Sequence, residues 1–107
     1  MMMITDTEAE AANDYIMDNA GAFAKAKAEY LYLEQFRKSK KALIFLQKTG
    51  TVAEREAHAY GDPDYISLLD GIKVAVETME TLRWKIEASS LKIEIWRTQQ
   101  ANSRKGH

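Results

Sequence analysis

Two long stretches of this chain contain almost no residue that stops a helix. Residues 1–47 hold no proline and one glycine, Gly21, and residues 64–102 hold no proline and one glycine, Gly71. Because proline and glycine are the residues that most reliably end a helix, both stretches are predicted to be helical. No strand-like alternation of apolar and polar residues competes with this prediction.

Local signals mark where three helices begin. Thr5 followed by Glu8 reads as a capping box, in which the two side chains satisfy backbone amides that the first turn leaves unpaired. Residues 51–54 repeat the pattern. Asp62 before Pro63 combines a favoured N-cap with a proline at the first helical position, where its missing N–H costs nothing.

Two glycines mark where helices end. Gly50 and Gly61 are each predicted to take the left-handed conformation that closes a helix. The Asn19–Gly21 step leaves open a break in the first helix. The sequence therefore predicts one helical domain over 1–107, with helices at about 5–48, 52–60 and 63–103 and a polar tail at 104–107.

Apolar residues recur every seven positions in both long helices, which is typical of helices that pack against each other. The first helix has this seam at Ile16, Phe23, Ala26, Tyr30, Leu33 and Ile44, and the third at Tyr65, Leu68, Ile72, Ala75, Met79, Leu82, Ile86, Ile93 and Trp96. Arg37 interrupts the first seam. We expect the long helices to form an antiparallel hairpin joined by the short helix.

Each long helix also carries a second apolar stripe that one helix–helix contact does not cover. These interface candidates are Tyr32, Phe36, Leu43 and Leu46 on the first helix, and Trp84, Ala88, Leu91 and Ile95 on the third. Self-association is the simplest way to cover them. The predicted fold class is therefore all-α: a long antiparallel hairpin that associates into a helical-bundle oligomer, with a dimer preferred.

Charge alternates in sign along the chain, whose net charge is −1. Residues 1–36 and 51–80 each carry seven acids and two bases, whereas residues 37–50 carry five bases and no acid. A hairpin turning near residue 56 would place position i opposite about position 112 − i, so that basic segments face acidic ones. This register predicts three groups of neighbours: Phe23 with Ser89 and Ser90, Arg83 with Glu29, and Arg97 with Asp14 and Asp18.

The segment FRKSKK, residues 36–41, places four cations in six residues. One interpretation is a solvated face offset by Asp62, Asp64 and Asp70. The other is a phosphate-binding ridge, with aromatic rings nearby to stack on bases. The candidate nucleic-acid-binding residues are Arg37, Lys38, Lys40, Lys41, Arg97, Arg104 and Lys105.

Most catalytic chemistries find no support in these residues. There is no cysteine, and His58 and His107 are the only histidines. Neither a phosphate-binding loop nor a hydrolase motif is present, and Glu54, Glu56, His58, Asp62 and Asp64 lack the spacing of a known metal site. We therefore expect no enzyme, no cofactor, no metal and no membrane partner, and a location in a reducing cytoplasm.

Three runs resemble a mostly uncharacterised group of small helical proteins encoded by tailed bacteriophages and prophages, near replication and recombination genes. They are EYLYLEQFRKSKKAL, TVAEREAHAYGDPDYISLLDGIKVAVE and LRWKIEASSLKIEIWRTQQANSR. The resemblance implies action in the host cytoplasm on DNA or a host factor. The leading hypothesis is a non-enzymatic oligomeric accessory protein of phage DNA recombination or replication that binds single-stranded DNA or a DNA-processing partner. The alternatives are an inhibitor of a host defence or host enzyme, and a virion or scaffolding component.

Overall fold

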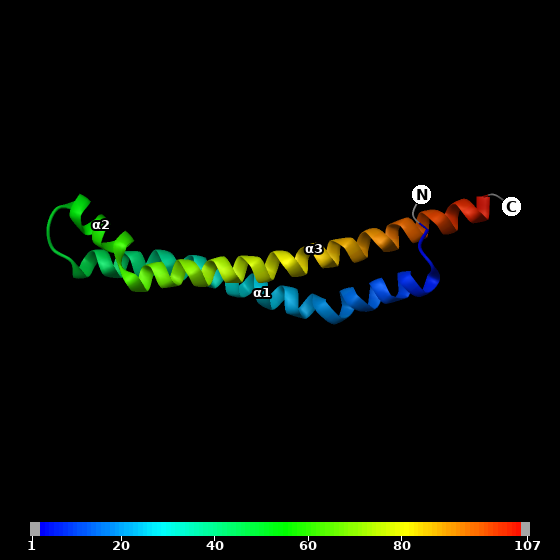
Figure 1. Cartoon of the computed structure of the whole chain (residues 1–107), viewed down its shortest axis with the longest axis horizontal. Helices are drawn as coiled ribbons and strands as arrows, with labels where there is room; N and C mark the ends of the chain where they lie inside the picture. The colour runs from blue at the N-terminus through cyan, green and yellow to red at the C-terminus, as the bar shows by residue number, and fades with distance from the viewer. Residues whose placement is uncertain (1–2, 106–107) are drawn as a thin grey trace. The chain divides into compact units, whose positions relative to one another are not determined.

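Three α-helices make up nearly all of the part of the chain that the structure describes (Figure 1). The structure is a computed structural model and describes residues 3–105. α1 spans Asp6–Gln47, α2 spans Val52–Gly61 and α3 spans Pro63–Lys105, and no strand occurs in residues 3–105. The all-α prediction is confirmed, and α3 continues through Arg104 and Lys105, which the sequence assigned to the polar tail.

None of the helices in the described part of the chain is long and apolar enough to cross a membrane.

All three predicted helix starts are formed. The Thr5 hydroxyl accepts the Glu8 N–H at 3.1 Å, and the equivalent bond within residues 51–54 is also 3.1 Å. Asp62 Oδ1 accepts the N–H groups of Asp64 at 2.8 Å and Tyr65 at 3.3 Å. These bonds satisfy amides that a helix cannot pair internally.

The two predicted glycine stops behave differently. Gly50 has φ of 112°, the left-handed conformation expected for it. Gly61 does not; it is the last residue of α2, and no other described residue has a positive φ. The reason lies one residue on, because Asp62 precedes Pro63 and the proline ring excludes the helical conformation there. Asp62 is extended, at φ −67° and ψ 129°, and this ends α2.

Replacing Gly50 by alanine is expected to lower the free energy of unfolding by about 1–3 kcal/mol, because a Cβ is strained in the left-handed region. The added methyl would also meet the carboxylate end of Glu54, a flexible side chain that can move away. Thermal unfolding followed by circular dichroism measures the loss. Gly21→Ala is the matched control: nothing lies within 4 Å of a Cβ there, and alanine favours the helix. Loss of stability in both variants would contradict the assignment.

The possible break in the first helix does not occur. α1 runs through Gly21 without interruption, and the Asn19 side-chain amide donates to the Tyr15 carbonyl at 2.9 Å, within the helix.

The heptad prediction is confirmed by burial. Every apolar seam residue named above is buried or half-buried. Seven apolar residues among those described are buried, and their side chains are mostly small or at the ends of helices: Ile4, Ala9, Ala12, Ile44, Ala59, Tyr65 and Ile72. The seams therefore form a narrow core.

Contacts divide the chain into two compact units, which we describe separately. In residues 26–79, Ile44, Ala59 and Tyr65 form the core, each at most 3% exposed. Arg37, which interrupts the seam, donates to the Tyr65 hydroxyl at 3.4 Å and to Glu34 at 3.2 Å. The polar seam position is thus satisfied by partners from both long helices of this unit.

The other unit contains the described residues 3–25 and 80–105. The Gln99 side chain holds the backbone of Ile4 through two hydrogen bonds, accepting its N–H at 2.9 Å and donating to its carbonyl at 3.0 Å. Trp96 Nε1 donates to Asp6 Oδ1 at 2.7 Å. These contacts attach the start of the chain to the end of α3.

The predicted register is wrong by about nine residues. Within the units, Ile4 contacts Gln99 and Lys40 contacts Asp64. The two residue numbers of each contacting pair therefore add up to 103 or 104, whereas the predicted register required 112. α2 is the cause, because it lies back along α1: Arg55 Nε donates to the Phe45 carbonyl at 3.2 Å. α3 therefore begins beside Lys40.

The neighbours predicted from that register change accordingly. Ser89 lies in a groove with Tyr15, so Phe23 is about 12 Å further along α1. The carboxylates bonded to the two arginines come from their own helix: Glu80 binds Arg83 at 3.0 Å, and Glu94 binds Arg97 at 3.1 Å.

Candidate nucleic-acid interface

Three of the four cations in the FRKSKK segment already have partners within residues 26–79. Arg37 binds Tyr65 and Glu34, and Lys40 lies 3.7 Å from Asp64. Lys41 donates to the Tyr60 hydroxyl, and its Nζ lies 4.0 Å from the centre of the Tyr60 ring. The predicted role of Asp64 in offsetting this segment is confirmed, whereas Asp62 is used as the N-cap of α3.

These bonds also stabilise the charged forms. The hydrogen bond from Arg37 to Tyr65, and then Glu34, raises the pKa of the Arg37 guanidinium. The hydrogen bond to Tyr60 raises the pKa of the Lys41 ammonium. Both cations are thus bonded to partners within the chain. Lys38 is exposed and forms no ion pair with any described residue.

A second group of cations lies on α3 in the unit formed by residues 3–25 and 80–105. Trp96, Arg97, Gln100 and Arg104 line an open groove of about 480 Å³. Arg104 Nε donates to the Gln100 carbonyl at 3.4 Å. Arg97 and Arg104 are seven residues apart, so they project from one side of the helix. The groove therefore places two guanidinium groups beside an indole ring.

Another groove of the same unit lies earlier along α3, on a different side of the helix. Tyr15, Lys85, Ala88, Ser89 and Lys92 line a hollow of about 350 Å³, with the two lysines again seven residues apart. We define the α3 basic band as Lys85, Lys92, Arg97 and Arg104, together with Tyr15 and Trp96. Its residues span about 28 Å of helix, with the two lysines about 120° around α3 from the two arginines.

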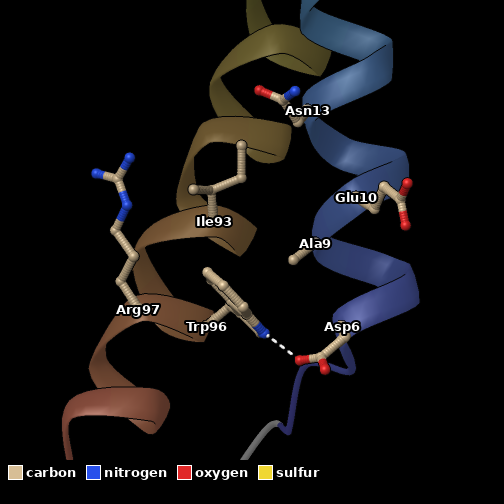
Figure 2. Close-up of a pocket in the computed structure, with 7 residues that line it drawn as sticks. All are labelled: Asp6, Ala9, Glu10, Asn13, Ile93, Trp96 and Arg97. Atoms are coloured by element: carbon tan, nitrogen blue, oxygen red, sulfur yellow. Dashed lines mark hydrogen bonds between the residues drawn. The ribbon is translucent and has the colours of Figure 1, made fainter.

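A third hollow, of about 330 Å³, shows how Trp96 is held (Figure 2). Its indole N–H points to Asp6, and Ala9 leaves room beside the ring. Arg97 extends away from α1 in this view, and its partner Glu94 is as exposed as Arg97 itself, at 66%. Because an exposed pair contributes only about 0–1 kcal/mol, Arg97 is easily released to another anion.

The structure changes which residues are the strongest candidates. It places Arg97 and Arg104 in one groove. Lys105 is exposed and lies in the same last turns of α3. The structure adds Lys85, Lys92 and Trp96, which the sequence analysis did not select. The seven-residue spacing of 85 with 92 and of 97 with 104 was visible in the sequence, but the aromatic partner Tyr15 comes from α1.

The apolar stripes remain open. Tyr32, Phe36, Leu43 and Leu46 are 41–72% exposed, and Trp84 and Leu91 are about 60% exposed. Ala88 is also exposed, whereas Ile95 is half-buried. Within residues 3–105, no three acidic or histidine side chains gather as a metal site would require.

Comparison with protein-family models, with curated proteins and with solved structures finds no match to this chain.

Proposed function

We propose that this chain is a non-enzymatic, self-associating accessory protein of phage DNA metabolism that binds single-stranded DNA along the α3 basic band. The observation that carries the proposal is the groove that Trp96 lines together with Arg97 and Arg104. Proteins that bind single strands without sequence preference combine cations for phosphates with aromatic faces for bases. The α3 basic band has both.

The charge distribution favours this band over the FRKSKK segment. A cation that gives up a partner to bind phosphate gains less than one that faces water. Arg37, Lys40 and Lys41 each have a partner on another helix. By contrast, within residues 3–105 Arg97 pairs only with Glu94 of its own helix, and Lys85 and Lys92 form no ion pair. The proposed role of the FRKSKK segment is to join α1 to the start of α3.

The same proposal includes the arrangement of the helices. We propose that the antiparallel contacts within each unit continue as one long hairpin, and that two copies associate through their exposed apolar stripes. The narrow core supports this, because a small domain with few buried residues commonly relies on association for stability. A dimer would also bring two α3 basic bands into one particle.

Titration of a labelled single-stranded oligonucleotide tests the DNA contact. With four phosphates neutralised, the slope of log affinity against log salt is expected to be about −3, which is roughly a 50-fold loss between 50 and 200 mM salt. Changing Lys85, Lys92, Arg97 and Arg104 to glutamine is expected to remove most of the affinity and the salt dependence.

A second variant serves as the charge-matched comparison. Changing Arg37, Lys38, Lys40 and Lys41 to glutamine removes the same charge and is expected to leave most of the binding, since three of these cations have internal partners. Circular dichroism verifies that both variants are helical. If this variant loses binding and the α3 basic band variant keeps it, the binding site lies in the FRKSKK segment. No affinity at low salt in the unaltered protein would overturn the DNA contact altogether.

Absence of DNA binding at low salt would favour the protein-binding alternative, an inhibitor of a host enzyme or defence. Trp84 is 60% exposed, and the Arg83 guanidinium lies 5.0 Å from the centre of its ring. Exposed tryptophan with arginine is a frequent anchor of protein interfaces. The acidic segments 6–18 and 54–70 would supply the charge complementary to a nucleic-acid site on the host protein. This alternative predicts capture of one host protein that is lost in Trp84→Ala.

A further inference from the structure

The exposed apolar stripe of α1 has an internal symmetry. Tyr32 and Phe36 lie seven and three residues before Ser39. Leu43 and Leu46 lie four and seven residues after it. At 100° per residue, all five project from α1 within an arc of about 80°. Two large apolar residues therefore flank a small central residue on each side.

This stripe contains no charge. Between Glu29 and Gln47, the residues within its arc are neutral: Tyr32, Phe36, Ser39, Leu43 and Leu46. Gln35 and Ala42 border one edge of the arc, whereas Lys40 lies about 40° beyond the other edge. The cations of the FRKSKK segment project elsewhere, with Arg37 and Lys41 directed to Tyr65 and Tyr60. A second stripe of the same kind can cover the arc itself without burying a charge, and Lys40 at its border is held by Asp64 at 3.7 Å. DNA finds no phosphate partner within the arc.

We infer that two copies of this chain pair through α1 in antiparallel orientation, with a two-fold axis at Ser39. The inference rests on the proposed self-association and specifies its surface and geometry. Tyr32 is then level with the second copy's Leu46, and Phe36 is level with position 42 of the second copy, one residue from its Leu43. The small Ser39 side chain lets the two helices approach at the axis.

The parallel orientation is disfavoured by charge. Lys25 and Glu29 continue the line of the stripe toward the N-terminus of α1. Parallel pairing in register would set each of them beside the same residue of the second copy, and like charges at such positions repel. Antiparallel pairing instead sets Glu29 level with Thr49, beyond the end of α1. Both orientations bring the two FRKSKK segments level with each other, so these cations do not distinguish the orientations.

The exposed area is sufficient for a specific contact. The four apolar side chains are 41–72% exposed, and the stacked rings of Tyr32 and Phe36, with centroids 6.2 Å apart, present a flat surface. Since an aromatic side chain buries roughly 150–250 Å², covering the stripe and its neutral borders on two copies removes on the order of 1,000 Å² from water. Specific interfaces begin near this size.

Disulfide trapping tests the geometry, because the chain has no cysteine of its own. Ser39→Cys under a mild oxidant is expected to convert most of the protein into a covalent dimer on a denaturing gel, because the two sulfurs meet at the axis. Tyr32→Cys alone is expected to stay monomeric on the gel, since its copies are about 21 Å apart along the helix. Mixing Tyr32→Cys with Leu46→Cys is expected to produce the crosslinked pair.

The outcomes separate this geometry from the self-association on which it rests. A monomeric mass for the unaltered protein by light scattering would overturn both. A dimeric mass with no crosslink at Ser39, or with a crosslink of Tyr32→Cys to itself, would overturn only the antiparallel pairing. Ala57→Cys, exposed on α2, controls for random collision: crosslinking there as strong as at Ser39 would also count against the inference.

Discussion

Replacing Tyr65 by alanine is expected to lower the free energy of unfolding by about 3–5 kcal/mol, the usual cost of removing a buried aromatic ring. Tyr65 is 2% exposed and packs with Ile44 and Ala59 at the point where all three helices meet. Its ring also lies edge-on to Tyr60, with centroids 6.0 Å apart. Because small domains are stable by only about 5–15 kcal/mol, this one change is expected to unfold much of the protein.

Chemical denaturation followed by circular dichroism measures this effect, and Tyr65→Phe separates its two causes. Phenylalanine keeps the ring and removes the hydroxyl that accepts from Arg37 at 3.4 Å. A hydrogen bond to a charged group contributes about 1.5–3 kcal/mol at most, and less at this distance. Tyr65→Phe is therefore expected to lose no more than about 1 kcal/mol. Equal losses in the two variants would show that the hydroxyl, and not the packing of the ring, dominates.

Replacing Leu43 by arginine is expected to weaken self-association at least about 100-fold, which is about 2.7 kcal/mol. Leu43 is 53% exposed in the single chain, so the substitution leaves the core of its unit intact. In the paired protein the guanidinium would lose water without gaining a partner, a costly change in an apolar contact. Sedimentation across a range of concentrations is expected to show the monomer where the unaltered protein is a dimer.

Ala57→Arg is the control for this substitution. It adds the same charge at an exposed position of α2, away from the stripe, and is expected to leave the mass unchanged. The affinity of each chain for a short oligonucleotide is expected to persist in Leu43→Arg, because the α3 basic band belongs to the other unit. A Leu43→Arg variant that remains dimeric would place the interface elsewhere, with the α3 stripe around Trp84 as the next surface to test.

The two surfaces have different consequences for function. The α3 basic band supplies charge and aromatic faces from one unit, and the α1 stripe supplies an uncharged contact from the other. Two linked bands would bind one strand more tightly than a single band, because the second contact becomes intramolecular. Loss of pairing is therefore expected to reduce affinity for long oligonucleotides more than for short ones.

The candidate site was only partly accessible from the sequence. Arg97, Arg104 and Lys105 were selected as candidates, and the structure places the first two in one groove. The FRKSKK segment was conspicuous because it holds four cations in six residues. Its cations proved to have partners at Tyr60, Asp64 and Tyr65, which are 19–28 residues away in sequence. Density of charge is a local property, whereas availability of charge depends on those distant partners.

The sequence by itself determined the helices, their ends and the faces they bury. Capping by Thr5, the left-handed Gly50 and the seven-residue seams all depend on residues within one or two turns of each other, and they were predicted correctly. Only the tertiary structure decided which positions of α1 and α3 lie side by side. That register follows from α2 lying back along α1, where Arg55 reaches Phe45 and Tyr60 reaches Lys41. A heptad repeat is satisfied equally well after a shift of one or more repeats, so contacts at the turn between the helices select one register among several.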